Sequence, residues 1–207
     1  PPRSTLSSSS AASDVYKRQI MSSKWLIVGL GNPEPKYEKN RHNIGFWVMD
    51  FSFNKLEKET VKNKYSGLFK SVINDNEVYF STPFFYINES GIAVKKISNE
   101  LSIEPSKIII VVDDMNLNLG EIRIRTKGGH GGHNGLRSIE YELGTNEYNR
   151  LRIGIGKPGN KNDHIDYVLG DFSKNEESIA LKSIESAYLC ILEIINNGFV
   201  KAMEKFN

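Results

Sequence analysis

This sequence contains little cysteine and no long apolar run. A single cysteine, Cys190, stands among 207 residues, which excludes an internal disulfide, and no CxxC or Cys/His cluster indicates structural zinc. The apolar runs at residues 25–28 and 108–112 fall far short of the roughly 18 residues that a membrane-spanning helix needs. We therefore expect a soluble protein that works in a reducing compartment, the cytoplasm.

Neither sign of charge is in clear excess. The chain carries 27 basic and 25 acidic residues, and its first twenty positions hold three basic residues and one acidic, so the remainder has 24 of each. Binding to a nucleic acid would therefore depend on a local basic patch rather than on net charge. A hydrophobic content of 39% excludes a disordered chain, and the length is sufficient for one compact domain.

Residues 1–20 differ in composition from the rest of the chain. They are rich in serine and alanine, show no periodicity, and lack the apolar stretch of a secretory signal. An organellar transit peptide is one interpretation, and a non-native or disordered leader is the other. We favour the leader, because position 1 is not Met and Met21 stands just before the first expected strand. We therefore expect one domain over residues 21–207.

Strand-like and helix-like segments alternate along this domain. We expect strands at residues 24–30, 65–71, 77–81, 108–112, 121–127 and 150–155, and helices at 42–58, 89–101, 136–143, 173–196 and 199–206. Residues 74–76 (Asn-Asp-Asn) are typical of a turn, and Ser173 with Glu176 has the spacing of a helix capping box. The alternation predicts an α/β fold: a single-domain three-layer sandwich in which helices flank a mostly parallel mixed sheet.

A glycine motif, GLGNP at residues 29–33, follows the first expected strand. Dinucleotide-binding loops begin in this way, and Asp50 lies near the offset of a ribose-binding acid, but positions 34 and 35 are Glu and Pro where that fingerprint needs a third glycine. We favour a tight turn that leaves the strand. It places Asn32 at the carboxyl end of a central strand, where open α/β sheets bind ligands.

His42 and Asp113 form a candidate catalytic pair. His42 lies where a helix is expected to begin, and Asp113 ends the apolar strand at residues 108–112, so both would lie at the sheet edge that carries Asn32. A carboxylate that is hydrogen-bonded to an imidazole fixes its tautomer and stabilises its protonated form, which makes a general base near neutral pH. Taken singly, His42 is also consistent with a helix cap and Asp113 with a strand end.

A glycine-rich loop, GGHGGHNG, is expected at residues 128–135. Its histidines, His130 and His133, would suit zinc together with Asp113, but glycines between ligands make a floppy site and no other motif supports a metal, so we expect none. The backbone amides of the loop would instead bind a phosphate or a polar substrate, with Asn134 opening the next helix.

Basic residues alternate with isoleucines at residues 121–127. Ile122 and Ile124 would point to one side of the strand, and Arg123, Arg125 and Lys127 to the other. Three charges alone are typical of a solvated edge strand, but more follow: Arg137, Arg150, Arg152, Lys157 and Lys161. A continuous patch of this kind would bind phosphates rather than read bases.

The sequence offers no clear nucleophile for covalent catalysis. No serine stands in a nucleophile-elbow setting, and the apolar surroundings of Cys190 indicate core packing.

Six motifs in order connect these features. They are LIVGLGNP at 26–33, a stretch from Tyr37 that contains RHNIGF at 41–46, YINESG at 86–91, VDD at 112–114, GGHGGHNGLRSI at 128–139 and RLRIGIGKPG at 150–159. In this order and spacing the chain resembles bacterial-type peptidyl-tRNA hydrolases. The resemblance implies an enzyme that hydrolyses the ester between a peptide and the 3′ ribose of tRNA and so recycles tRNA from aborted translation.

The resemblance also implies roles for individual residues. His42 matches the base that activates water, and Asp113 matches the carboxylate that orients it. The other implied positions are Asn32 and Asn134 as catalytic amides, Asn88, Tyr37, Tyr86 and His133 as substrate contacts, and Arg125 and Arg152 as a clamp for the 5′ phosphate. It implies peptidyl-tRNA as partner, with no metal or cofactor, no membrane and no obligate protein partner. From the balanced charge we expect a monomer.

The chain departs from the family pattern at six positions. The family usually has Gly, Thr and Asp where Glu34, Asn40 and Asn116 stand, and Lys, Thr and Met where Thr82, Phe85 and Ile87 stand. We expect these differences to alter peptide-side contacts and loop geometry rather than the base. The alternative function is a non-catalytic RNA-binding relative, such as the organellar splicing factors of this family. Such a relative would lack the His or Asn groups, which are all present here.

Overall fold

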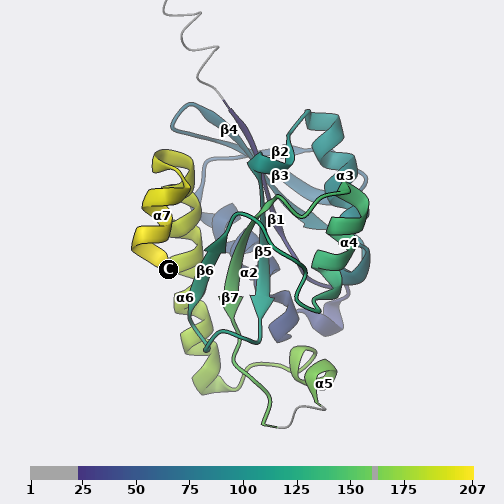
Figure 1. Cartoon of the computed structure of the whole chain (residues 1–207), viewed down its shortest axis with the longest axis vertical. Coiled ribbons are helices and arrows are strands. Elements are labelled where there is room, and N and C mark those ends of the chain that lie inside the picture. The colour runs from purple at the N-terminus through teal and green to yellow at the C-terminus, as the bar shows by residue number, and fades with distance from the viewer. Residues whose placement is uncertain (1–22, 160–162) are drawn as a thin grey trace, which may run out of the picture.

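The computed structural model describes residues 23–159 and 163–207, which form seven strands and the helices that cover them (Figure 1). The strands are β1 (Lys24–Gly29), β2 (Glu59–Val61), β3 (Ser66–Ile73), β4 (Asn76–Pro83), β5 (Ile108–Asp114), β6 (Ile122–Arg125) and β7 (Asn149–Gly154). The helices are α2 (Ile44–Lys55), α3 (Ser90–Leu101), α4 (Asn134–Leu143), α5 (His164–Val168), α6 (Lys174–Asn197) and α7 (Phe199–Phe206), with 3-10 turns η1 (Pro35–Tyr37), η2 (Arg41–Asn43), η3 (Ile87–Glu89) and η4 (Pro105–Lys107). The leader expected at 1–20 and Lys161 lie outside the described residues.

The strands form one mixed sheet in the order β2-β3-β4-β1-β5-β7-β6. The four central strands, from β4 to β7, are parallel, whereas β3 and β6 run antiparallel beside them and β2 pairs antiparallel with β3. β5 is buried on both faces, which explains why residues 108–112 are continuously apolar. The expected α/β fold is confirmed.

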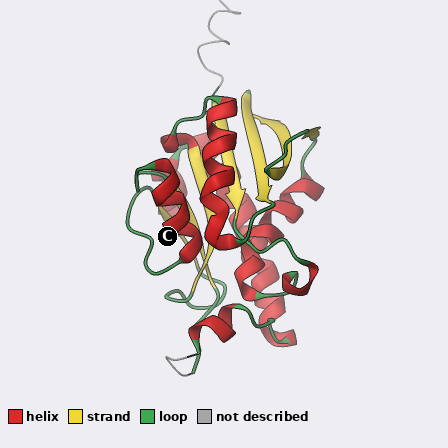
Figure 2. Cartoon of the chain, turned by 90° about the vertical axis from the view of Figure 1, so that its right-hand side faces the viewer, coloured by secondary structure: helices red, strands yellow, loops and turns green. Residues whose placement is uncertain are grey.

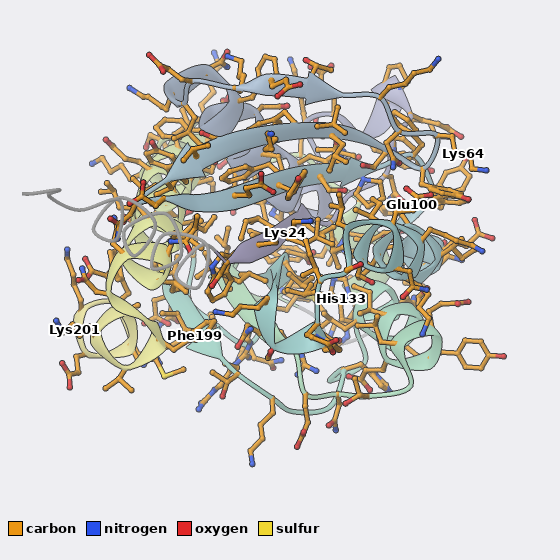
Figure 3. The ribbon with its side chains drawn as sticks, turned by 90° about the horizontal axis from the view of Figure 1, so that it is seen from above. Lys24, Lys64, Glu100, His133, Phe199 and Lys201 are labelled. Atoms are coloured by element: carbon orange, nitrogen blue, oxygen red, sulfur yellow. The ribbon has the colours of Figure 1, made fainter. Side chains whose placement is uncertain are left out.

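Helices cover both faces of the sheet and give the three expected layers. α3 and α4 lie on one face, nearest the viewer in Figure 2, and α2, α6 and α7 lie on the other. From above, in Figure 3, Glu100 on α3 lies on the opposite side of the sheet from Phe199 and Lys201 on α7. In the described parts of the chain, no helix is both long and apolar enough to cross a membrane.

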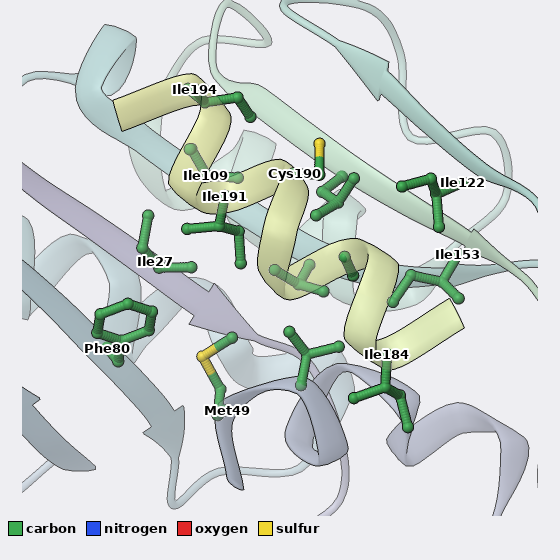
Figure 4. Packing of buried hydrophobic residues seen from close by; sticks show 14 of the residues in the cluster. Ile27, Met49, Phe80, Ile109, Ile122, Ile153, Ile184, Cys190, Ile191 and Ile194 are labelled. Atoms are coloured by element: carbon green, nitrogen blue, oxygen red, sulfur yellow. The ribbon is translucent and has the colours of Figure 1, made fainter. Parts of the chain in front are cut away.

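Cys190 lies in the larger of the two core clusters, between the sheet and α6 (Figure 4). Its thiol is fully buried, and burial raises its pKa to about 12. A thiol with such a pKa stays protonated and is a poor nucleophile. The expected packing role of Cys190 is confirmed.

Local sequence signals act as expected at two places. Asn74 and Asp75 take φ angles of 48° and 63° in the turn between β3 and β4, a backbone conformation that these residue types tolerate. Ser173 and Glu176 form the reciprocal hydrogen bonds of the capping box that begins α6. The sequence does not predict β2 and α5, because elements of three and five residues show no periodic pattern.

Close helix packing accounts for the glycines after β1. A Cβ atom on Gly29 would lie 2.3 Å from the carbonyl oxygen of Gly45, and one on Gly31 would lie 2.8 Å from the Phe46 ring. The glycines therefore let the start of α2 pack directly against the end of β1. The motif brings α2, and with it η2, against the carboxyl edge of the sheet.

Candidate active site

The predicted polar residues gather at the carboxyl edge of the parallel strands. Asn32 follows β1, Asp113 is the penultimate residue of β5, and Asn88 lies in η3 after β4. η2 precedes α2 at the same edge and carries His42. The expectation that His42 and Asp113 share this edge with Asn32 is confirmed.

His42 and Asp113 are in direct contact. Nδ1 of His42 lies 2.8 Å from Oδ1 of Asp113, whose side chain is almost fully buried. An ionised carboxylate only accepts hydrogen bonds, so Nδ1 of His42 donates the proton. In the neutral ring, Nε2 then carries a lone pair, and within residues 23–159 and 163–207 no protein group is hydrogen-bonded to it.

His133 binds the same carboxylate oxygen. Its Nε2 lies 3.1 Å from Oδ1 of Asp113, and its Nδ1 accepts hydrogen bonds from the N–H groups of Gly135 and Leu136. Because Nδ1 accepts, the neutral ring carries its proton on Nε2 and donates it to Asp113. His133 therefore caps α4, which begins two residues earlier than the sequence predicts, and also supports Asp113.

The three side chains shift one another's protonation equilibria. Burial alone would raise the pKa of Asp113, but the two imidazoles beside it hold that pKa well below its usual range. Burial alone would lower the pKa of His42, but the charge of Asp113 and the hydrogen bond to it outweigh burial and raise this pKa above its ordinary value. His42 is thus a stronger base than a free imidazole.

These three residues also have the composition of a metal site. Ligand atoms of His42, Asp113 and His133 lie within 4.8 Å of one another, which is close enough for a divalent cation. The hydrogen bonds of His133 disfavour metal binding. Its Nδ1 accepts two backbone N–H groups, so its Nε2 carries the proton and has no lone pair for a cation. The absence of a resident metal stays a prediction, which metal analysis tests.

Buried hydrogen bonds hold the Asn32 side chain in one orientation. Its Oδ1 accepts from the Ile87 N–H at 2.9 Å, while its backbone is bound on both sides by the Asn43 side chain. Because Ile87 occupies Oδ1, the Nδ2 atom of Asn32 is left to donate to a ligand. The sequence does not single out Asn43, since this role depends on a contact between two loops.

Asn88 and Asn134 line an open groove of about 530 Å³ beside α3 and α4. Both side chains are exposed, and Oδ1 of Asn134 accepts a hydrogen bond from Arg137 at 3.1 Å. Tyr86 is exposed two residues before Asn88, and Tyr37 is half-buried at the end of η1. The amide side chains of the groove are therefore accessible to a ligand.

The basic stripe of β6 continues across β7 on one face of the sheet. Arg123 lies opposite Arg152 and Arg125 lies opposite Arg150, while Ile122 and Ile124 are buried as expected. Arg125 is exposed, whereas Nε of Arg152 lies 2.5 Å from a carboxylate oxygen of Asp114. The two arginines of the expected clamp therefore differ, since only Arg125 is fully accessible.

Arg150 does not belong to the exposed patch, and that expectation is wrong. Its side chain is buried and donates hydrogen bonds to the carbonyl oxygens of Gly128 and Gly129 and to the carboxylate of Glu140. A buried guanidinium needs such partners. Arg150 therefore orders the glycine-rich loop instead of facing a phosphate.

A histidine–carboxylate pair at the carboxyl edge of a parallel sheet lies where α/β folds bind ligands and can activate water by general base catalysis. Comparison with known proteins identifies the family. The family model described as peptidyl-tRNA hydrolase matches residues 26–207. This chain belongs to the peptidyl-tRNA hydrolase family.

Individual relatives cover nearly the whole described chain. A peptidyl-tRNA hydrolase of Clostridium botulinum (strain Alaska E43) is 43% identical over 185 residues, and one of Aquifex aeolicus is 42% identical over 183, each match covering 88% of this chain and 95% of the relative. The crystal structure of peptidyl-tRNA hydrolase from Acinetobacter baumannii has a TM-score of 0.83 and 38% identity, and covers 90% of this chain and 96% of that one.

The departures from the family pattern leave the pair of His42 and Asp113 intact. At Ile87, the contact with Asn32 uses the backbone N–H, so it does not depend on which side chain stands there. Asn40 donates a hydrogen bond to Asp171 at 3.0 Å and so joins η2 to the segment before α6. Of the others, Glu34 pairs with Lys36, Phe85 packs half-buried against the core, and Asn116 donates its N–H to Asp114.

Proposed function

We propose that this protein hydrolyses the ester bond between the peptide and the 3′ ribose of peptidyl-tRNA, with His42 as the base that activates water. The observation that carries the proposal is the 2.8 Å contact between Nδ1 of His42 and Oδ1 of Asp113 in a member of this family. The contact leaves Nε2 of His42 as the atom that takes up a proton.

In the proposed reaction, a water molecule transfers a proton to Nε2 of His42 while the water oxygen bonds to the carbonyl carbon of the ester. Charge develops on the carbonyl oxygen and is stabilised by amide donors, of which Nδ2 of Asn32 is held ready and Asn134 is the second. His42 then returns the proton to the ribose oxygen as the C–O bond breaks, which releases the peptide acid and the tRNA. An ester needs less acid assistance than an amide, so one base and two donors suffice.

The resemblance to the family implies the substrate contacts, and the exposure of most of these side chains supports them. We assign the groove with Asn88, and Tyr86 beside it, to the peptide side of the ester, and Tyr37 to the 3′ end of the tRNA. For His133, which the resemblance implies as a substrate contact, we propose instead a role through Asp113, because its two ring nitrogens are bound to Asp113 and to the start of α4. Arg125, with Arg152 behind it, is assigned to the 5′ phosphate, a contact that positions the tRNA without reading its bases.

We further propose that the protein acts as a monomer in the cytoplasm, without a metal, a cofactor or an obligate protein partner. The protonated Nε2 of His133 supports the metal-free part of this proposal. Size-exclusion chromatography with light scattering and elemental analysis of the purified protein test it. A stable dimer or stoichiometric zinc that activity requires would contradict it.

The decisive experiment measures peptide release from an N-blocked aminoacyl-tRNA by the wild type and by His42→Ala, with and without a chelator. We expect wild-type turnover that survives chelation and is lost in the variant. A wild-type protein that binds the tRNA but never cleaves it would instead establish the alternative, an RNA-binding relative. Turnover retained in His42→Ala would reject the proposed base.

A further inference from the structure

The three residues of η2 are each bound to a different part of the protein. Asn43 binds the backbone of Asn32 after β1, and His42 binds Asp113 in β5. Arg41 extends away from both, toward α5 and α6. A 3-10 helix has three residues per turn, so successive side chains point about 120° apart and reach three separate elements. The orientation of His42 therefore depends on its two neighbours as well as on Asp113.

Arg41 joins η2 to a segment that lies 126 to 135 residues later in the chain. Its Nη2 donates to Oε2 of Glu176 at 3.0 Å, and its Nη1 donates to the carbonyl oxygen of Tyr167 at 3.4 Å. The guanidinium also lies 4.4 Å from the centre of the Tyr167 ring. A planar group that forms forked hydrogen bonds and stacks as well is held in one orientation, which lysine cannot reproduce.

The segment that receives Arg41 is itself fixed to the fold. The hydroxyl of Tyr167 donates to the carbonyl oxygen of Ile155, just after β7, at 2.7 Å. Glu176 closes the capping box with Ser173 at the start of α6. Burial alone would raise the pKa of Glu176, but hydrogen bonds from Ser173 and Arg41 outweigh burial and lower it, so the carboxylate is charged at neutral pH. Arg41 therefore binds a fixed point of the structure.

We propose that Arg41 is a positioning residue for the hydrolysis, which holds η2 so that the His42 imidazole stays aligned with Asp113 and the scissile ester. The inference rests on the proposed function, because it takes His42 as the base. Arg41 is 9% exposed and its partners are protein groups, so it acts through His42 rather than on the substrate.

The test compares Arg41→Gln and Arg41→Lys with Lys205→Gln, which removes an exposed ion pair between α7 and α6 far along the chain from η2. We expect kcat of Arg41→Gln to fall about tenfold, since a displacement of well under 1 Å is enough for such a loss, with KM within about twofold. The kcat of Arg41→Lys should lie between the values of the wild type and Arg41→Gln. The kcat of Lys205→Gln should equal that of the wild type. The NMR signal of the hydrogen-bonded Nδ1–H of His42, whose polar neighbours Asp113 and His133 are unaltered, should shift or broaden only in the Arg41 variants.

Two results would overturn the inference. One is a lower Tm with kcat and the His42 Nδ1–H signal unchanged, which would make Arg41 a stabilising residue only. The other is a raised KM with kcat unchanged, which would place Arg41 in substrate binding. Should Arg41→Gln fail to fold, Glu176→Gln tests the same link, because glutamine preserves the capping box while removing the charge that Arg41 binds. The NMR signal does not depend on turnover, so it separates failure of this inference from failure of the proposed function.

Discussion

His42 in η2 and His133 before α4 reach the same oxygen of Asp113, at 2.8 and 3.1 Å, but they differ at their second ring nitrogen. Nδ1 of His133 accepts two backbone N–H groups of α4, whereas Nε2 of His42 is available for a proton. Residue type and distance to the carboxylate are therefore nearly the same in the two regions. The hydrogen bond on the far side of each ring decides which histidine can act as a base.

The second ring nitrogens also differ in what occupies them. Nδ1 of His133 is the acceptor for two backbone N–H groups at the start of α4. A proton on Nε2 of His42 breaks no protein hydrogen bond among the described residues, and Asp113 stabilises the resulting charge. Of the two imidazoles bound to Asp113, His42 is therefore the one whose second ring nitrogen is available to a water molecule.

The largest expected effect is that of His42→Ala. Loss of the base should abolish measurable turnover, a decrease on the order of 10⁴, while affinity for tRNA stays near that of the wild type. Peptide release and filter binding of the same tRNA measure the two quantities. His133→Ala is the matched control, and an equally complete loss of turnover in that variant would erase the distinction between the two histidines.

The second effect is that of Asp113→Asn, which removes the charge shared by both rings. Turnover should fall on the order of 10³, because the imidazolium loses its partner. The pKa of His42 should drop, since burial, which lowers it, is then no longer outweighed by the carboxylate. An NMR titration of the His42 ring checks this shift. A His42 pKa that stays above its ordinary value would show that Asp113 does not control it.

The pH dependence of stability provides a further test of the same pair. The lowered pKa of Asp113 stabilises the fold above its unfolded value of 3.8, and this contribution is lost as pH falls through the folded pKa. The raised pKa of His42 stabilises the fold below 6.5, and this contribution is lost as pH rises through the folded pKa. Urea unfolding of Asp113→Asn should therefore lack two features of the wild type, the loss of stability at acid pH through Asp113 and the loss above pH 6.5 through His42. Two identical profiles would contradict both assignments.

A smaller effect should separate the two functions of His133. Asparagine is a good N-cap but cannot reach Asp113 as the imidazole does, so His133→Asn should lower kcat about tenfold with little change in stability. His133→Ala should show the same kinetic loss and in addition lose about 1 kcal/mol of unfolding free energy. Kinetics and thermal unfolding of both variants check this. Equal stabilities of the two variants would show that the cap contributes nothing.

Much of the fold and part of the site could be predicted from the sequence, because they depend on local patterns. Apolar periodicity reports which face of a helix or strand is buried, and the Ser173 capping box lies within four residues. The contact between His42 and Asp113 could be expected because parallel strands have their carboxyl ends at the same edge of the sheet. The contact of Arg41 with Glu176, 135 residues away, has no local signature.

Arg150, the one arginine of the expected patch that is found to be wrong, shows the same limit. Arg150 and Arg125 are indistinguishable in a sequence that alternates basic and apolar residues, yet one is buried under the glycine-rich loop and the other is exposed. The difference is set by the loop, whose Gly128 takes a φ angle of 140° and whose carbonyls bind Arg150. Such a loop conformation cannot be derived from strand periodicity.

The smallest expected effect concerns the two arginines of the proposed phosphate clamp. Arg125 is exposed, so Arg125→Ala should mainly raise KM and reduce the slope of log affinity against log salt by about 1. Arg152 is paired with Asp114, so Arg152→Ala also leaves that carboxylate unpaired near the site and should lower kcat as well. Lys201→Ala, which alters an exposed lysine of α7, is the control for loss of one positive charge. An unchanged salt slope in Arg125→Ala would show that Arg125 does not bind a phosphate. An equal change of slope in Lys201→Ala would show that net charge, and not a local patch, attracts the tRNA.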